Sequence, residues 1–73
     1  MNLSEIKAGM RVKYIPEHAC GNPWHPDCEV GTVSSVTEHN AFVRFDQEVH
    51  RLGWAGATSK LCSPDHLRLN QED

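Results

Sequence analysis

The chain has 73 residues, a formal net charge of −3 and a pI near 5.9. A chain of this length is expected to form one domain, residues 1–73. Its core is small, so its folding stability is expected to be marginal. The seven lysines and arginines are scattered, which weakens the case for non-specific attraction to nucleic-acid phosphates. No apolar run reaches the roughly 20 residues that a membrane-spanning helix needs, and the first residues lack a signal-peptide pattern. We therefore expect a cytoplasmic protein that makes no membrane contact.

The first element expected is a turn of helix over residues 3–9, capped by Ser4 and ended by Gly9. A strand is predicted over residues 10–15, where apolar and basic side chains alternate. Pro16 ends that strand, because proline has no backbone N–H to donate to a sheet.

A loop of 13 residues follows, from Pro16 to Cys28, and contains three prolines. Loops of this length in a small domain are usually functional or disordered. This loop carries an unusual number of reactive and aromatic side chains for its length. They are His18, Cys20, Trp24, His25, Asp27 and Cys28.

The stretch 29–46 predicts a β-hairpin, with strands over 30–36 and 41–45 that flank a polar tetrapeptide. Gly31 suggests a bulge or a sharp bend in the first of these strands. In the second, Val43 and Phe45 are expected on one face, and Phe42 and Arg44 on the other.

The segment from Asp46 to Gly56 is polar and spaced by glycines, so no regular element is expected there. A fourth strand is predicted over residues 57–62, with Lys60 facing out and Leu61 facing in. Residues 63–66 suit a tight turn or one turn of 3₁₀ helix. Residues 67–69 then form a last strand, and 70–73 a frayed tail.

Five short strands, a long first loop and a one-turn helix before the last strand are typical of an all-β fold. The order resembles the SH3-like small barrel, which leaves its loops available for binding. The segments that carry this resemblance are 7–14, 31–36, 42–45 and 62–69.

Several segments also resemble a group of small phage and prophage proteins with no assigned activity. The segments are Tyr14-Ile15-Pro16, His18-Ala19, His25-Pro26-Asp27-Cys28-Glu29, Val33-Ser34-Ser35 and Phe42-Val43-Arg44-Phe45. The resemblance implies a phage or mobile-element origin and a fold. It implies nothing about Cys20 and Trp24, which fall between the matching segments.

Three cysteines cannot all pair within one chain, and in a reducing cytosol they would be free thiols or metal ligands. A structural zinc site is one interpretation, with Cys20, His25 and Cys28 as ligands and Cys62 or His18 as the fourth. The alternative is that Cys28 is a small buried apolar residue and the histidines face solvent. The paired Cys-x-x-Cys signature of zinc domains is absent from the sequence.

Cysteine catalysis is a further alternative, with Cys28 beside His25 or Cys62 beside His66. A barrel of this size leaves little volume for a substrate, and no catalytic motif surrounds either thiol. We therefore do not expect an enzyme.

Trp24 and Trp54 both fall outside the predicted strands, where an aromatic ring can anchor a protein partner. At least one of them is expected to cap the open end of the barrel instead. The predicted partner-binding residues are Trp24, His25, Asp27, Leu52 and Trp54.

A nucleotide or nucleic acid is the alternative ligand, with a base stacked on a tryptophan. Its phosphates would meet four basic residues predicted to point outward: Arg11, Lys13, Arg44 and Lys60. The preferred interpretation is a non-enzymatic module that binds a protein. Small phage proteins commonly act stoichiometrically, for example by blocking a host defence complex, and this analogy gives the expected mode of action.

Overall fold

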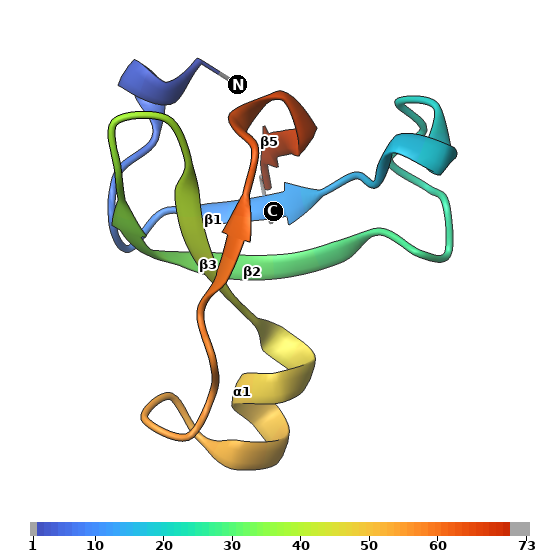
Figure 1. Cartoon of the computed structure of the whole chain (residues 1–73). Coiled ribbons are helices and arrows are strands. Elements are labelled where there is room, and N and C mark those ends of the chain that lie inside the picture. Colours follow the sequence, from blue (N-terminus) through green and yellow to red (C-terminus); the bar gives the residue numbers. More distant parts are fainter. Residues whose placement is uncertain (1, 71–73) are drawn as a thin grey trace.

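The computed structural model of the chain describes residues 2–70 and contains one curled antiparallel sheet and one α-helix (Figure 1). The strands are β1 (Arg11–Tyr14), β2 (Glu29–Val36), β3 (Ala41–Phe45), β4 (Lys60–Cys62) and β5 (Leu67–Leu69). The helix α1 spans Asp46–Leu52, and three 3₁₀ turns span Leu3–Glu5 (η1), Glu17–Ala19 (η2) and Pro64–His66 (η3).

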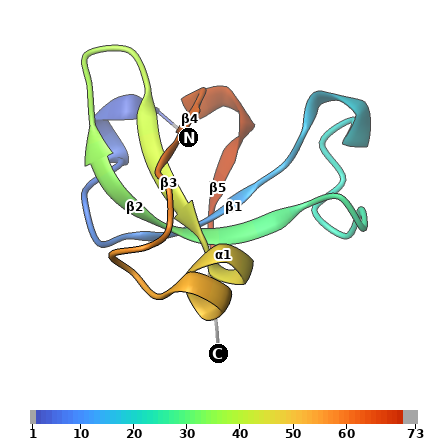
Figure 2. The same ribbon diagram turned by 60° about the horizontal axis from the view of Figure 1, so that its bottom comes forward.

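The five strands lie in the order β4-β3-β2-β1-β5, and each neighbouring pair is antiparallel. The sheet curls into a half-barrel, with α1 at one end and the loop between β1 and β2 extending from another side (Figures 1 and 2). β4 and β5 form the two edges, each three residues long. The expectation of a small all-β fold is therefore confirmed, with α1 as an addition.

Alternating apolar side chains fill the concave side of the sheet. On β3, Ala41, Val43 and Phe45 are buried while the residues between them are not, as their alternation predicts. The core cluster consists of Ile6, Val12, Val33, Ala41, Val43, Phe45, Cys62 and Leu67. Because these residues come from all five strands and the N-terminal segment, burying them also bends the sheet.

The polar tetrapeptide between β2 and β3 forms the predicted turn. The Thr37 amide donates to the carbonyl of Asn40 at 2.8 Å, and the Thr37 hydroxyl accepts from the Asn40 amide at 3.0 Å. The irregularity in β2 lies between Val33 and Ser35, not at Gly31. The bulge therefore lies further along the strand than expected.

Gly31 instead permits a close approach of two strands. A Cβ atom at this position would lie 2.6 Å from Cγ1 of Val43 and 2.7 Å from the backbone oxygen of Arg44. Both distances are well inside van der Waals contact. The residue at position 31 must therefore lack a side chain for β2 and β3 to pack as they do.

The expectation of no regular element after Asp46 was wrong, because residues 46–52 form α1. Acidic residues occupy its first turn and basic residues its last turn, which suits the helix dipole. Gly53 follows with φ of 79° and donates its amide to the carbonyl of Val49 at 2.7 Å. Two turns are too short to show a helical repeat in the sequence.

The fourth strand is shorter than predicted, and its side chains have the opposite orientation. Cys62 pairs with the buried Ala41 and faces the core, whereas Leu61 pairs with Phe42 and is 59% exposed. The expected inward position of Leu61 was therefore wrong. The pairing register of this strand cannot be read from its own residues, and a shift of one residue exchanges the two faces.

The N-terminal turn was also misplaced. η1 ends at Glu5, Asn2 holds its N-cap position without a side-chain bond, and Ser4 lies inside the turn. Gly9 does not end a helix. It has φ of 89° in the turn before β1, where its amide donates to the carbonyl of Val33 at 2.7 Å.

The C-terminal elements follow the prediction more closely. Ser63 caps η3 by accepting a hydrogen bond from the amide of Asp65, and β5 follows directly. The amide of Asn70 donates to the carbonyl of Arg11 at 3.0 Å, so this residue is attached to the sheet. The rest of the expected frayed tail, 71–73, lies outside the described residues.

The close approach at Gly31 gives a first prediction. Gly31→Ala should lower the free energy of unfolding by roughly 1–3 kcal/mol, the usual range for overpacking, because backbone atoms of β3 must move. Urea denaturation followed by circular dichroism measures this change. Ser35→Ala, on an exposed position of the same strand, is the matched control and should change stability by less than about 0.5 kcal/mol. Equal stability of the two variants would contradict the packing argument.

Candidate binding surface

The convex side of the sheet, opposite the core, carries a group of cations that we call the outer face. Arg11 pairs with Thr32 on β2, and Thr32 pairs with Arg44 on β3, so the three side chains form a row across the sheet. Lys13 pairs with Arg68 on β5 and lies on the same side. The structure thus brings together three of the four predicted phosphate-binding residues and adds Arg68, which sequence analysis did not select.

Lys60, the fourth predicted cation, does not belong to this face. It pairs with the buried Val43 and therefore lies on the core side of β4, at the rim of the sheet. Its Nζ is 3.9 Å from Oε2 of Glu48 and 6.0 Å from the centre of the Phe45 ring. The proposed stripe of four basic side chains is therefore incomplete at this position.

Arg11 links the outer face to α1. Its guanidinium group donates to both carboxylate oxygens of Asp46, at 2.6 and 2.5 Å, and to the hydroxyl of Thr32 at 2.9 Å. Hydrogen bonding and charge from Arg11 hold the pKa of the Asp46 carboxyl below its ordinary value. Much of the positive charge of Arg11 is thus already neutralised.

Lys13 holds Trp24 beside the outer face. Its Nζ donates to the carbonyl of Pro23 at 3.1 Å and lies 5.3 Å from the centre of the Trp24 ring, within the range of a cation–π interaction. The amide of Trp24 donates to the side-chain oxygen of Asn22 at 3.0 Å. The backbone of this tryptophan is therefore fixed, although its side chain is 85% exposed.

Arg44 holds Trp54 in the same way. The guanidinium carbon lies 4.5 Å from the ring centre, and Nη1 donates to the Trp54 carbonyl at 3.0 Å. Nε of Arg44 donates to the hydroxyl of Ser59 at 3.1 Å, and Ser59 in turn bonds the hydroxyl of Ser34 at 2.8 Å. Trp54, 46% exposed, is thus oriented by a network that begins on the sheet.

The two tryptophans therefore flank a single surface. From the strand pairing, Lys13 and Arg44 are two strands and two residues apart, about 12 Å between Cα atoms. Neither tryptophan belongs to the core cluster, so the expectation that one of them caps the barrel was wrong. Leu52, exposed at the end of α1, precedes Trp54 by two residues.

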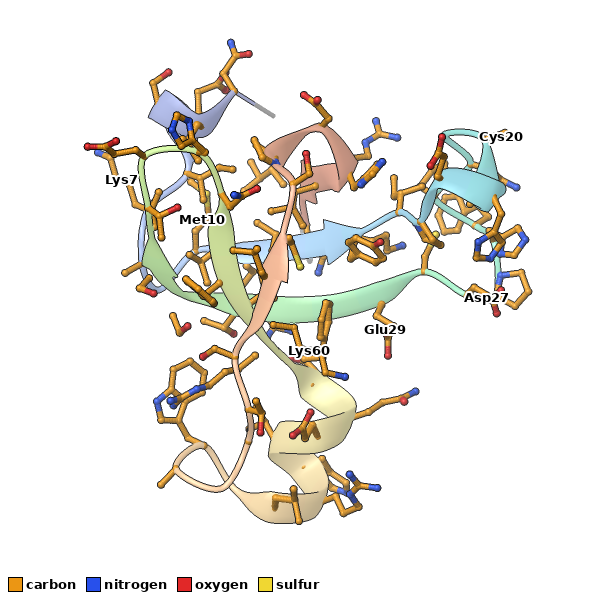
Figure 3. All side chains as sticks on the ribbon, in the orientation of Figure 1. Lys7, Met10, Cys20, Asp27, Glu29 and Lys60 are labelled. Carbon is orange, nitrogen blue, oxygen red and sulfur yellow. The ribbon has the colours of Figure 1, made fainter. Side chains whose placement is uncertain are left out.

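His25 and Asp27, the remaining predicted partner-binding residues, contact each other and His18. Nε2 of His18 lies 2.7 Å from Oδ2 of Asp27, and Nδ1 of His25 accepts a hydrogen bond from the Asp27 amide at 3.0 Å. The hydrogen bond from His18 lowers the pKa of the Asp27 carboxyl. These three residues, here called the loop cluster, lie in the loop far from β4, as the labels of Asp27 and Lys60 in Figure 3 indicate.

The four residues predicted to bind zinc do not come together among the described residues. Of Cys20, His25, Cys28 and Cys62, only His25 belongs to a group of three or more metal-ligating side chains. Each thiol instead contacts a backbone oxygen: Cys20 that of His18, Cys28 that of Asn22 and Cys62 that of Lys60. The two Cys–His pairs considered for catalysis form no thiol–imidazole hydrogen bond in the described part of the chain.

A pocket of about 420 Å³ lies between the start of the long loop and η3. Ile15, Pro16 and Leu67 form its apolar part, and Glu17, Asp65 and Arg68 contribute charge. None of the predicted partner-binding, phosphate-binding or zinc-binding residues lines it, whereas His66, which was considered for catalysis, does. A sequence signal for Arg68 was available, since Leu67 and Arg68 alternate on the last strand.

Comparison of the chain with protein-family models, with curated proteins and with solved structures gives no match. Among residues 2–70, no helix is long and apolar enough to cross a lipid bilayer.

The ion pair between Arg11 and Asp46 predicts a pH dependence. Because the folded-state pKa of Asp46 is lowered, its stabilising effect is present above about pH 4 and disappears as the pH falls through the folded value. Asp46→Asn should therefore cost roughly 0.2–1 kcal/mol at pH 7 and less near pH 2. Urea denaturation at the two pH values measures the difference. Glu38→Gln, on the exposed hairpin turn, should show no such dependence.

The thiols should differ in reactivity. Cys20 is exposed, whereas Cys62 is 4% exposed and burial raises its pKa, which disfavours the reactive thiolate. Iodoacetamide should therefore modify Cys20 first, and Cys62 only after denaturation. Peptide mass spectrometry over time resolves the three sites. Rapid labelling of Cys62 in the folded protein would contradict its placement in the core.

Proposed function

We propose that this chain is a non-enzymatic SH3-like module that acts in the cytoplasm by binding a protein partner through its outer face. The strand order, the long first loop and the 3₁₀ turn before the last strand support the SH3-like assignment. The observation that carries the binding function is the pairing of each exposed tryptophan with a cation from one face of the sheet.

Tryptophan and arginine are the residue types that most often dominate the energy of protein interfaces. Here both tryptophans are held before any partner arrives, one by Lys13 and Asn22 and the other by Arg44. Holding an anchor in place reduces the conformational entropy lost on binding. The surface is thus suited to recognition, and α1 and the long loop form its two borders.

The chemistry of the surface favours a partner segment with acidic and apolar side chains. Lys13 and Arg68 are paired across β1 and β5, and acidic groups would complement them. On the opposite side of the outer face, Leu61 of β4 and Phe42 of β3 form an apolar pair next to Arg44. With an origin in a phage or mobile element, such a module would act stoichiometrically, for example on a host defence complex.

A single-stranded nucleic acid is the second candidate, because cations beside exposed aromatic rings also suit stacked bases and phosphates. The charge distribution argues for the protein instead. Arg11 is neutralised by Asp46, Lys60 lies off the face, and the net charge of the chain is −3. A protein interface requires no cluster of unpaired cations, whereas strong phosphate binding depends on one.

The test is affinity capture from a bacterial host lysate, followed by titration calorimetry with the purified captured protein. Trp24→Ala and Trp54→Ala should each weaken binding by about 30-fold, as expected for a hot spot worth about 2 kcal/mol. Val36→Ala, which removes an exposed apolar side chain at the hairpin, is the control and should bind like the wild type. Circular dichroism verifies that each variant is folded.

Two outcomes would contradict this proposal. If the tryptophan variants bind as tightly as Val36→Ala, the outer face is not the binding surface. If nuclease treatment abolishes capture and affinity falls steeply with salt, the ligand is a nucleic acid.

A further inference from the structure

The loop cluster of His18, His25 and Asp27 brings together three side chains of the kinds that bind metal ions, and the protein-binding proposal makes no use of this arrangement. Each residue offers one ligand atom, and these three atoms all lie within 4.8 Å of one another. In the described part of the chain it is the one such group of metal-ligating side chains. Two imidazoles and one carboxylate are a donor set that suits divalent zinc and its first-row neighbours.

The backbone around the cluster already holds these side chains close together. η2 carries His18, and Pro26 fixes the backbone between His25 and Asp27. The amide of His25 donates to the carbonyl of Asn22 at 3.2 Å, and that of Cys28 to the carbonyl of His25 at 3.0 Å. The two imidazole rings lie edge to face with centres 5.2 Å apart.

Little movement is needed to place a cation among the three groups. Ligands about 2.0–2.1 Å from a tetrahedral zinc ion are roughly 3.3 Å apart, so separations that all lie within 4.8 Å need to close by no more than about 1.5 Å. The nitrogen of His18 and the oxygen of Asp27, 2.7 Å apart in their hydrogen bond, would give up that bond and move apart to roughly 3.3 Å. Coordination through Nδ1 of His25 would exchange its hydrogen bond from the Asp27 amide for a metal bond.

We propose that His18, His25 and Asp27 form a binding site for a divalent first-row metal ion, with zinc as the best-suited ion and water completing the coordination. The site differs from the cysteine-rich set expected from the sequence, since Cys20 and Cys28 lie outside the cluster. Binding releases any proton held between His18 and Asp27. It also closes the loop between residues 18 and 27, which contains Trp24.

The experiment is calorimetric titration of the reduced full-length protein with Zn²⁺ alone at near-neutral pH. Wild type should bind one equivalent. His18→Ala and Asp27→Ala should each weaken binding by at least about 10-fold, the smallest loss seen even for residues that only support metal ligands. His39→Ala, an exposed histidine on the hairpin turn, is the matched control and should leave the affinity unchanged.

The double variant Cys20→Ser, Cys28→Ser separates this site from a thiolate site. It should bind Zn²⁺ like the wild type, and Co²⁺ bound to the wild-type protein should lack the near-ultraviolet charge-transfer band of a cobalt–thiolate bond. Because all these substitutions lie in an exposed loop or turn, the metal-free proteins should give identical circular dichroism spectra. No binding to the wild type, equal binding by His18→Ala, or loss of binding in the double cysteine variant would each overturn the proposal.

Discussion

The packing of the sheet depends on the close contact between β2 and β3 at Gly31. This residue lies on the central strand, between Val12 of β1 and Phe45 of β3. A side chain there would meet Val43 and the backbone of Arg44. Because Val43 and the backbone of β3 occupy the space beside Gly31, the apolar side chains of five short strands meet on the concave side of the sheet. A chain of this size can form a core only if its strands bend around such a small apolar centre.

The same curvature determines where the polar and aromatic groups lie. Once the concave side is filled, Arg11, Lys13 and Arg44 must point to the convex side, where each finds an acceptor or a ring. The tryptophans come from the connecting segments, yet the sheet orients them. The rings on these connecting segments are thereby held by contacts with the sheet, and such ordering would lower the entropy lost if a partner bound them.

The strands and the hairpin turn were predictable because alternation, Pro16 and the polar tetrapeptide are local signals. The errors came from properties that local sequence does not contain. The helix over residues 46–52 has only two turns, and its stability depends on contact with β2 and β3 as well as on its end charges. The burial of Cys62 rather than Leu61 depends on a strand register set by Ala41.

In the candidate site, too, some features follow from local sequence signals and others depend on the fold. Trp24 and Trp54 were selected as possible partner-binding residues because they fall outside strands, although one of them was expected to cap the barrel, and both are exposed. Their pairing with Lys13 and Arg44 depends on how the chain folds back, as does the meeting of His18 with Asp27. Spacing alone favoured the cysteines as ligands. Their thiols point instead to nearby carbonyl groups.

The two outer strands have a bearing on how copies of this protein behave in concentrated solution. An unpaired strand invites another chain to extend the sheet, which is a common route to aggregation. Here each edge strand has only three residues, and each includes a cation, Lys60 in β4 and Arg68 in β5. Pairing the edge strands of two copies would bring like charges together and would form very few new backbone hydrogen bonds. The chain can thus leave leucines such as Leu61 and Leu69 in contact with water without favouring fibrous assembly.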